Sequence, residues 1–138
     1  MAIDLEKQSM DLFTALNAHD VEGFLSFHTD DVVVTMADGS VIQGKENLRD
    51  YFKNSFAAIS EMKADLTSVF CSGDHLCEEY ILSGKHTGEF MGIPATGKSF
   101  SYRQVAVKTL RGDKISHVSS YSDSASLMKQ LGVLPSTP

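Results

Sequence analysis

Apolar residues recur at helical spacing in the first sixty positions of the chain. One such face runs from Leu5 to Leu16, a shorter one from Val21 to His28, and a third from about Lys45 to Ile59. Each spacing places its apolar side chains on one side of a helix. Asp20 stands directly before the second face and is a candidate N-cap. The pattern therefore predicts three amphipathic helices.

The pattern changes to strands in the rest of the chain. Val32–Met36 and Val41–Gly44 flank a turn and predict a small hairpin between the second and third helices. Four longer segments rich in Val, Tyr, Phe, Thr and Ser follow at 63–72, 75–87, 99–110 and 114–121. Asp123 and Ser124 then offer N-cap chemistry for a last helix, Ala125–Leu131, which Gly132 ends.

Helices followed by an antiparallel meander indicate an α+β fold, in which the helices cover one face of a curved sheet. A sheet bent around helices leaves a cavity at its open end, where small-molecule chemistry is expected first. The 138 residues suffice for one domain, 1–138, with one core.

Charge and composition limit the classes of partner that we expect the protein to bind. A formal net charge of −6 repels phosphate backbones and anionic lipids, so we expect neither nucleic acid nor membrane as a partner. The longest apolar run, Phe56–Ile59, is far too short to span a membrane, and Asp4 and Glu6 are atypical of a signal peptide. We therefore expect a cytoplasmic protein.

Cys71 and Cys77 are the only thiols. Two cysteines make neither a disulfide framework nor a convincing metal site, and a cytoplasmic setting favours free thiols. A three-residue loop at Gly73–Asp74 would place them opposite one another, within reach of a disulfide.

Three short patterns follow one another in the N-terminal half: Leu16–Asp20, His28–Val32 and Gly44–Glu46. In this order they resemble the nuclear transport factor 2-like superfamily, and the resemblance covers nearly the whole chain. It implies a cone-shaped, curved antiparallel sheet wrapped by three N-terminal helices. It also implies a homodimer formed through the outer face of the sheet, as in many relatives.

The C-terminal half resembles the SnoaL-like polyketide cyclases within that superfamily. The spaced set is Gly84–Lys98, Gly112–Ile115, Asp123 and Gln130–Gly132. The resemblance implies that Asp123 is the general acid/base of an intramolecular aldol ring closure, carried out without metal or cofactor. The sequence departs from the family at His117 and Ser119, where a glutamate and a tryptophan are usual, and at Glu79, where an arginine is frequent.

Asp123 and His86 are the candidate catalytic residues. Enolisation beside a carbonyl requires a carboxylate held near an apolar cavity, but an aspartate directly before Ser124 is also an ideal N-cap. His86 lies at a strand end beside Gly88, where a ligand can approach. Its imidazole can donate to or accept from a substrate oxygen, and a solvent-facing strand histidine is the alternative.

The turn at Gly112–Asp113 decides which side chains of the last two long strands reach the cavity. A two-residue loop puts Tyr102, Gln104 and Tyr121 on one face, whereas a loop one residue longer brings Arg103 and Tyr121 together there. The candidate substrate-binding residues on these strands are Arg103, Tyr102, Tyr121 and His117.

Apolar side chains complete the candidate cavity lining: Phe24, Phe27, Phe52, Phe90 and Met91. At helical spacing the first three also suit a plain core, as does His28 on the apolar face of the second helix. Phe90 and Met91 stand on a glycine-containing loop, 88–98, which we expect to act as a lid.

These observations predict a cyclase or isomerase that acts on a small apolar carbonyl compound by proton transfer next to the carbonyl. Asp123 is the expected acid/base, His86 a polar partner, and Arg103 or Tyr102 an orienting donor. The alternative is a module without turnover, which binds a small ligand or uses its exposed sheet face to bind a protein. The departures at His117, Ser119 and Glu79 favour this alternative.

Overall fold

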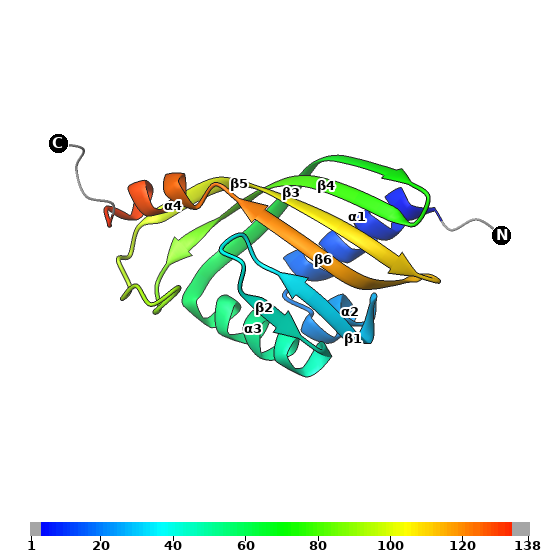
Figure 1. The fold of residues 1–138 in the computed structure, drawn as a ribbon. Helices are drawn as coiled ribbons and strands as arrows, with labels where there is room; N and C mark the ends of the chain where they lie inside the picture. Colours follow the sequence, from blue (N-terminus) through cyan, green and yellow to red (C-terminus); the bar gives the residue numbers. More distant parts are fainter. Residues whose placement is uncertain (1–3, 134–138) are drawn as a thin grey trace.

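The computed structural model describes residues 4–133 as four helices and one curved sheet of six strands (Figure 1). The helices are α1 (Leu5–Asn17), α2 (Val21–Leu25), α3 (Lys45–Ala58) and α4 (Ser124–Leu131). The strands are β1 (His28–Thr35), β2 (Val41–Gln43), β3 (Ile59–Ser72), β4 (His75–His86), β5 (Ser99–Arg111) and β6 (Lys114–Ser122). The predicted α+β class is confirmed.

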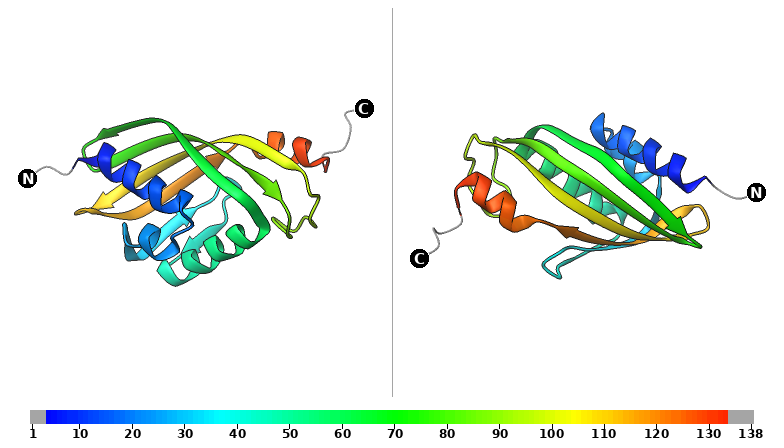
Figure 2. Two further views of the ribbon diagram at one scale, coloured as in Figure 1. Left: turned by 180° about the vertical axis from the view of Figure 1, so that it is seen from behind. Right: turned by 90° about the horizontal axis from the view of Figure 1, so that it is seen from above.

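Helices α1, α2 and α3 lie together on one side of the sheet, and α4 lies at the opposite end of the molecule from the start of α1 (Figures 1 and 2). The sheet curves over the three N-terminal helices, so that its concave face turns towards them. Most buried apolar side chains lie in this layer, and a second cluster joins α4 to β5 through Leu127, Leu131 and Phe100. None of the helices within residues 4–133 has the length and hydropathy needed to cross a membrane.

Side-chain caps explain where α1, α2 and α4 begin. The carboxylate of Asp20 accepts a hydrogen bond from the Gly23 amide, and that of Asp123 accepts one from the Ser126 amide. Both predicted N-caps are confirmed, and each satisfies an amide that the helix itself leaves unpaired. The second helix is shorter than predicted, because His28 already belongs to β1, where it pairs with Ile115 of β6.

The strands follow the order β2-β1-β6-β5-β4-β3. Strands β3 to β6 form the predicted antiparallel meander, and β1 and β2 form the predicted hairpin. The parallel pairing of β1 with β6 was not predicted. This pairing joins the hairpin to the meander and gives one continuous sheet.

A bulge in β6 decides which side chains face inwards. The loop at Gly112–Asp113 has two residues, since Arg111 pairs with Lys114. Further along β6, Ile115 and His117 pair with consecutive residues of β5, so Ser116 between them is an extra residue without a partner on β5. The bulge shifts the register so that Val105 pairs with Tyr121. Tyr121 therefore lies on the same face as Val105, and that face is the convex one.

The large apolar side chains exposed on the convex face include Phe70, Val107 and Tyr121. Formation of a homodimer through this face stays a prediction. Cys71 and Cys77 are both free thiols, as expected. Their hairpin loop has two residues, so Cys71 pairs with Leu76 and Cys77 with Phe70, and the thiols point to opposite faces.

Candidate functional site

A cavity of about 120 Å³ lies between the concave face of the sheet and helices α1, α2 and α3. For comparison, an engineered protein cavity of about 150 Å³ holds benzene, so this cavity suits a compound of about one ring. Several helices and strands contribute to its lining, which is mostly apolar. The apolar side chains include Leu12, Leu16, Phe24, Phe52, Ile59 and Phe90.

A chain of hydrogen bonds crosses the cavity wall from β4 to β5. The Tyr80 hydroxyl donates to Oε1 of Gln104 at 2.6 Å, and Nε2 of Gln104 donates to the Tyr102 hydroxyl oxygen at 2.8 Å. Tyr80 and Gln104 are direct partners in the ladder, and all three side chains line the cavity. In the described part of the chain no acceptor takes the proton of Tyr102, which is therefore available to a ligand.

Burial keeps these tyrosines protonated. It raises the pKa of Tyr80 and of Tyr102 well above the usual range, because the phenolate would lose its hydration. Burial also raises the pKa of Tyr51, which lines the cavity from α3. At neutral pH Tyr102 is thus a neutral hydrogen-bond donor in apolar surroundings, where such a bond is stronger than in water.

An ion pair also lines the cavity. Nζ of Lys108 on β5 lies 2.7 Å from Oε1 of Glu78 on β4, and both side chains are almost fully buried. The Ser9 hydroxyl from α1 donates to the other Glu78 oxygen, and the ammonium stands 6.0 Å from the ring centroid of Phe13. Buried charges are expensive unless paired and hydrogen-bonded, so such a group is a candidate for function.

His28 lines the cavity beside this pair and is uncharged. Its ring Nδ1 lies 3.0 Å from the Phe24 carbonyl oxygen, so Nδ1 carries the proton and donates it. Burial, followed by the charge of Lys108, lowers its pKa from 6.5 to about 3. His28 is therefore the hydrogen-bonded core histidine expected from the sequence, and its ring also forms part of the cavity wall.

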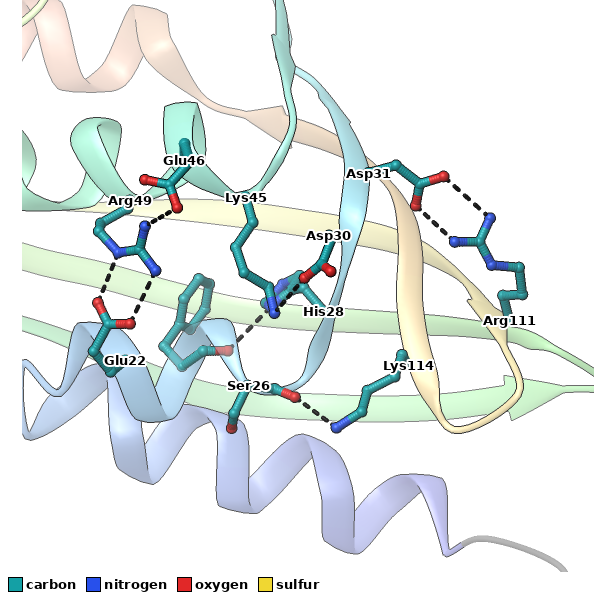
Figure 3. A network of polar contacts seen from close by, with 11 residues as sticks. Glu22, Ser26, His28, Asp30, Asp31, Lys45, Glu46, Arg49, Arg111 and Lys114 are labelled. Carbon is teal, nitrogen blue, oxygen red and sulfur yellow. Dashed lines mark hydrogen bonds and ion pairs between the residues drawn. The ribbon is translucent and has the colours of Figure 1, made fainter.

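Surface ion pairs join the elements around His28 (Figure 3). Arg49 of α3 bonds Glu22 of α2 at 2.7 Å, and Lys45 lies 3.4 Å from Asp30 of β1. In each pair the carboxylate is exposed to water, so each pair contributes little by itself. Within residues 4–133, no three His, Cys, Asp or Glu side chains come close enough together to hold a metal ion.

The structure brings together four of the predicted substrate-binding residues. Tyr102, Phe24, Phe52 and Phe90 all line the cavity. Phe27 packs against the core without lining the cavity.

The other predicted substrate-binding residues lie elsewhere. Arg103, His117 and Tyr121 are exposed on the convex face, as strand alternation and the bulge at Ser116 require. Met91 is 57% exposed on the loop. Because neighbouring residues of a strand point to opposite faces, Tyr102 faces the cavity and Arg103 faces solvent. The sequence alone did not decide which of the two faces the cavity.

Asp123 does not line the cavity. Its carboxylate is exposed and caps α4, where Oδ1 accepts the Ser126 amide at 3.0 Å. Its own amide donates to the carbonyl oxygen of Arg103 at 3.0 Å, which places its backbone beside the residue that follows Tyr102. The catalytic role of Asp123 stays a prediction.

His86 is fully buried and does not line the cavity either. Its Nδ1 lies 3.0 Å from the Thr96 hydroxyl oxygen. Its main-chain amide donates a hydrogen bond to the Lys98 carbonyl oxygen, and its carbonyl oxygen accepts one from the Gly97 amide. This histidine fixes the far end of the loop between β4 and β5. Its role as a polar partner of the substrate stays a prediction.

The loop between β4 and β5 is attached to the end of α3. The amides of Thr87 and Gly88 both donate to the Ala58 carbonyl oxygen, at 3.0 and 2.8 Å. A Cβ on Gly88 would stand 3.0 Å from the Ala58 Cα, so a larger residue would push the loop away. This attachment places Phe90 in the cavity wall, and opening of the loop as a lid stays a prediction.

Sequence reasoning missed Glu78 and Lys108, although a signal was present. Glu78 stands at an alternating position between Leu76 and Tyr80, and Lys108 stands between Ala106 and Leu110. A charged residue in the apolar phase of a strand points into the core, where it requires a partner. Two such residues on neighbouring strands indicate a buried pair.

Comparisons with known proteins identify the family. The sequence profile of the family described as SnoaL-like polyketide cyclase matches residues 7–131. No curated protein matches the chain significantly.

Solved structures share the fold at low identity. TsrD from Streptomyces laurentii is 20% identical, with 96% of this chain and 100% of that chain covered and a TM-score of 0.86. IdmH from Streptomyces antibioticus, a putative polyketide cyclase, is 23% identical, with 95% and 100% covered and a TM-score of 0.81. AclR from Streptomyces galilaeus, a putative hydroxylase, is 20% identical, with 96% and 87% covered and a TM-score of 0.83. With the profile matching most of its length, the chain belongs to the SnoaL-like polyketide cyclase family.

Proposed function

We propose that the protein binds a small, mainly apolar carbonyl compound in the cavity and catalyses its cyclisation or isomerisation by proton transfer next to the carbonyl. Family membership supports the reaction class, and the apolar lining supports the ligand class. The observation that carries the proposal is the chain Tyr80–Gln104–Tyr102, which leaves the Tyr102 proton for a ligand oxygen.

In this proposal Tyr102 donates to the carbonyl oxygen. Removal of a proton from the neighbouring carbon places negative charge on that oxygen, and a donor fixed in advance stabilises this charge without reorganising. The Gln104 amide holds the Tyr102 oxygen at 2.8 Å and so fixes the direction of the phenol. Because the phenol stays protonated, it remains a donor over the physiological pH range.

Asp123 is the proton acceptor that the proposal takes from the family resemblance. In this role its carboxylate has to leave the Ser126 amide. Loss of such a cap costs about 1 kcal/mol, which the binding of a substrate can offset. The second candidate function is ligand binding without turnover, and the exposed, capping position of Asp123 favours it.

Acetophenone in D₂O tests both candidates, because it binds through a carbonyl and exchanges its methyl protons only through the enolate. We expect the wild type to accelerate the loss of the methyl signal in proton NMR. Tyr102→Phe should lower the rate of exchange by about 100-fold, the usual effect of removing one such donor. Tyr121→Phe, which removes an exposed hydroxyl from the convex face, should change nothing.

The outcomes separate the candidates. Acetophenone that binds without exchanging its protons supports the module without turnover and contradicts the enzyme. Equal exchange rates in the wild type and in Tyr102→Phe would remove Tyr102 from the mechanism.

A further inference from the structure

The hydrogen bond from Tyr80 fixes which way round the Gln104 amide lies. An amide can turn either its oxygen or its nitrogen towards a neighbour, and its hydrogen bonds decide between the two. The Tyr80 hydroxyl oxygen lies 2.6 Å from the amide, which is short for an N–H···O bond but ordinary for an O–H···O bond. Tyr80 therefore donates to Oε1, and Nε2 is left to face Tyr102 at 2.8 Å.

Tyr80 is the fixed end of this chain of hydrogen bonds. Its ring packs edge-on against Phe13, with the ring centroids 5.1 Å apart. Its backbone is paired directly with that of Gln104 in the ladder between β4 and β5. These contacts hold the Tyr80 hydroxyl against the amide oxygen and so hold the amide in one orientation.

The orientation of the amide decides what Tyr102 offers to a ligand. With Nε2 towards Tyr102, the amide donates to the phenol oxygen, and the phenol proton stays free for the cavity. With Oε1 in that place, the amide would accept this proton, and Tyr102 would offer a ligand only a lone pair. The first arrangement selects ligands with a hydrogen-bond acceptor, and the second selects ligands with a donor.

We propose that Tyr80 is a positioning residue, which acts through Gln104 to keep Tyr102 a hydrogen-bond donor. Tyr80 thereby makes the cavity prefer a ligand with a hydrogen-bond acceptor over one of equal shape without it. The role of Tyr102 as the donor to the ligand rests on the proposed function. The control of this donor by Tyr80 rests on the amide between them.

Tyr80→Phe removes the hydroxyl and keeps the ring. The Gln104 oxygen then has no donor, which is unfavourable inside a protein, so the amide should turn over and accept the Tyr102 proton. Acetophenone and α-methylstyrene measure the result by calorimetric titration, because they differ only in a carbonyl oxygen against a methylene group. The ratio of their affinities should shift against acetophenone by about tenfold, the upper range for one neutral hydrogen bond.

Three further variants test whether the effect passes through the amide. Tyr102→Phe lacks the donor altogether and should show the same ratio as Tyr80→Phe. Tyr121→Phe on the convex face should keep the wild-type ratio. The double variant Tyr80→Phe/Gln104→Leu removes the acceptor that would take the Tyr102 proton, so the preference for acetophenone should return. General damage to the cavity would instead leave the double variant without this preference.

A wild-type ratio in a folded Tyr80→Phe protein overturns the proposal, and so does a double variant without the preference. Equal ratios in the wild type and in Tyr102→Phe overturn it as well. If thermal unfolding shows that Tyr80→Phe does not fold, NMR of the wild type decides. The Gln104 amide protons should then show stronger nuclear Overhauser effects to the Tyr102 ring than to the Tyr80 ring, and the reverse order overturns the proposal.

The proposed function fails in a different way. If acetophenone does not exchange its methyl protons while the affinity ratios change as expected, the catalysis is contradicted and the role of Tyr80 stands.

Discussion

The two faces of strands β4, β5 and β6 carry the same kinds of side chain in opposite surroundings. Glu78 and Tyr102 are buried on the concave face, whereas Glu79 and Tyr121 are exposed on the convex face. Residue type alone therefore does not identify the site. Desolvation on the concave face strengthens hydrogen bonds and charge interactions, while water weakens those on the convex face.

Neutralising one glutamate on each face should give the largest contrast. Glu78→Gln leaves Lys108 as a buried cation without its counter-charge, and breaking a buried pair in this way costs about 3–5 kcal/mol. Glu79→Gln changes an exposed side chain and should alter the free energy of unfolding by less than about 0.5 kcal/mol. Urea unfolding of both variants measures the contrast, and similar losses would mean that Lys108 gains little from its partner.

The second contrast is between a buried and an exposed histidine, in how each makes the free energy of unfolding depend on pH. The unfolded chain protonates His28 near its ordinary pKa of 6.5, but the folded protein does so only near 3. Between these values acid favours the unfolded state, and the free energy of unfolding falls by about 1.4 kcal/mol per pH unit. From pH 6 to pH 4.5, His28→Asn should therefore lose about 2 kcal/mol less than the wild type.

The matched control for this experiment is His117→Asn on the convex face. It should follow the wild-type curve, measured by urea unfolding at each pH. If His28→Asn follows that curve too, the histidine is not buried in its neutral form.

Asp123 belongs to neither face, and its variants should affect the free energy of unfolding less than those of Glu78 or His28. Asp123→Ala removes the cap of α4 and should cost about 1 kcal/mol. Asp123→Asn keeps a capping oxygen but cannot accept a proton at neutral pH, so it should retain the free energy of unfolding and lose the exchange of acetophenone protons. Full exchange by a folded Asp123→Asn protein would exclude this residue as the base.

Apolar spacing was sufficient to predict the helices, because it records which side of each helix is buried. Segments rich in Val, Tyr, Phe, Thr and Ser between short turns were sufficient to predict the meander. The caps at Asp20 and Asp123 were also predictable, since capping depends on local geometry. The parallel pairing of β1 with β6 was not, because it joins segments that are distant in sequence and carries no local signal.

The site was predicted only in part. Tyr102 was identified, but whether Tyr121 shares its face was not, because the bulge at Ser116 lies in a polar run where no alternation marks an extra residue. Asp123 was chosen as a catalytic candidate because of the family resemblance, and such a resemblance does not say in which direction a side chain points. Glu78 was passed over because a lone glutamate in a strand is usually solvated.

The extra residue Ser116 also limits how residue roles can be transferred between members of the family. A gap placed on the wrong side of this position in an alignment would match inward side chains of one protein with outward side chains of another. At the 20% identity of TsrD, sequence does not fix such gaps. For the last strand, corresponding residues must therefore be assigned by superposing backbones rather than by counting from Gly112 or Asp123.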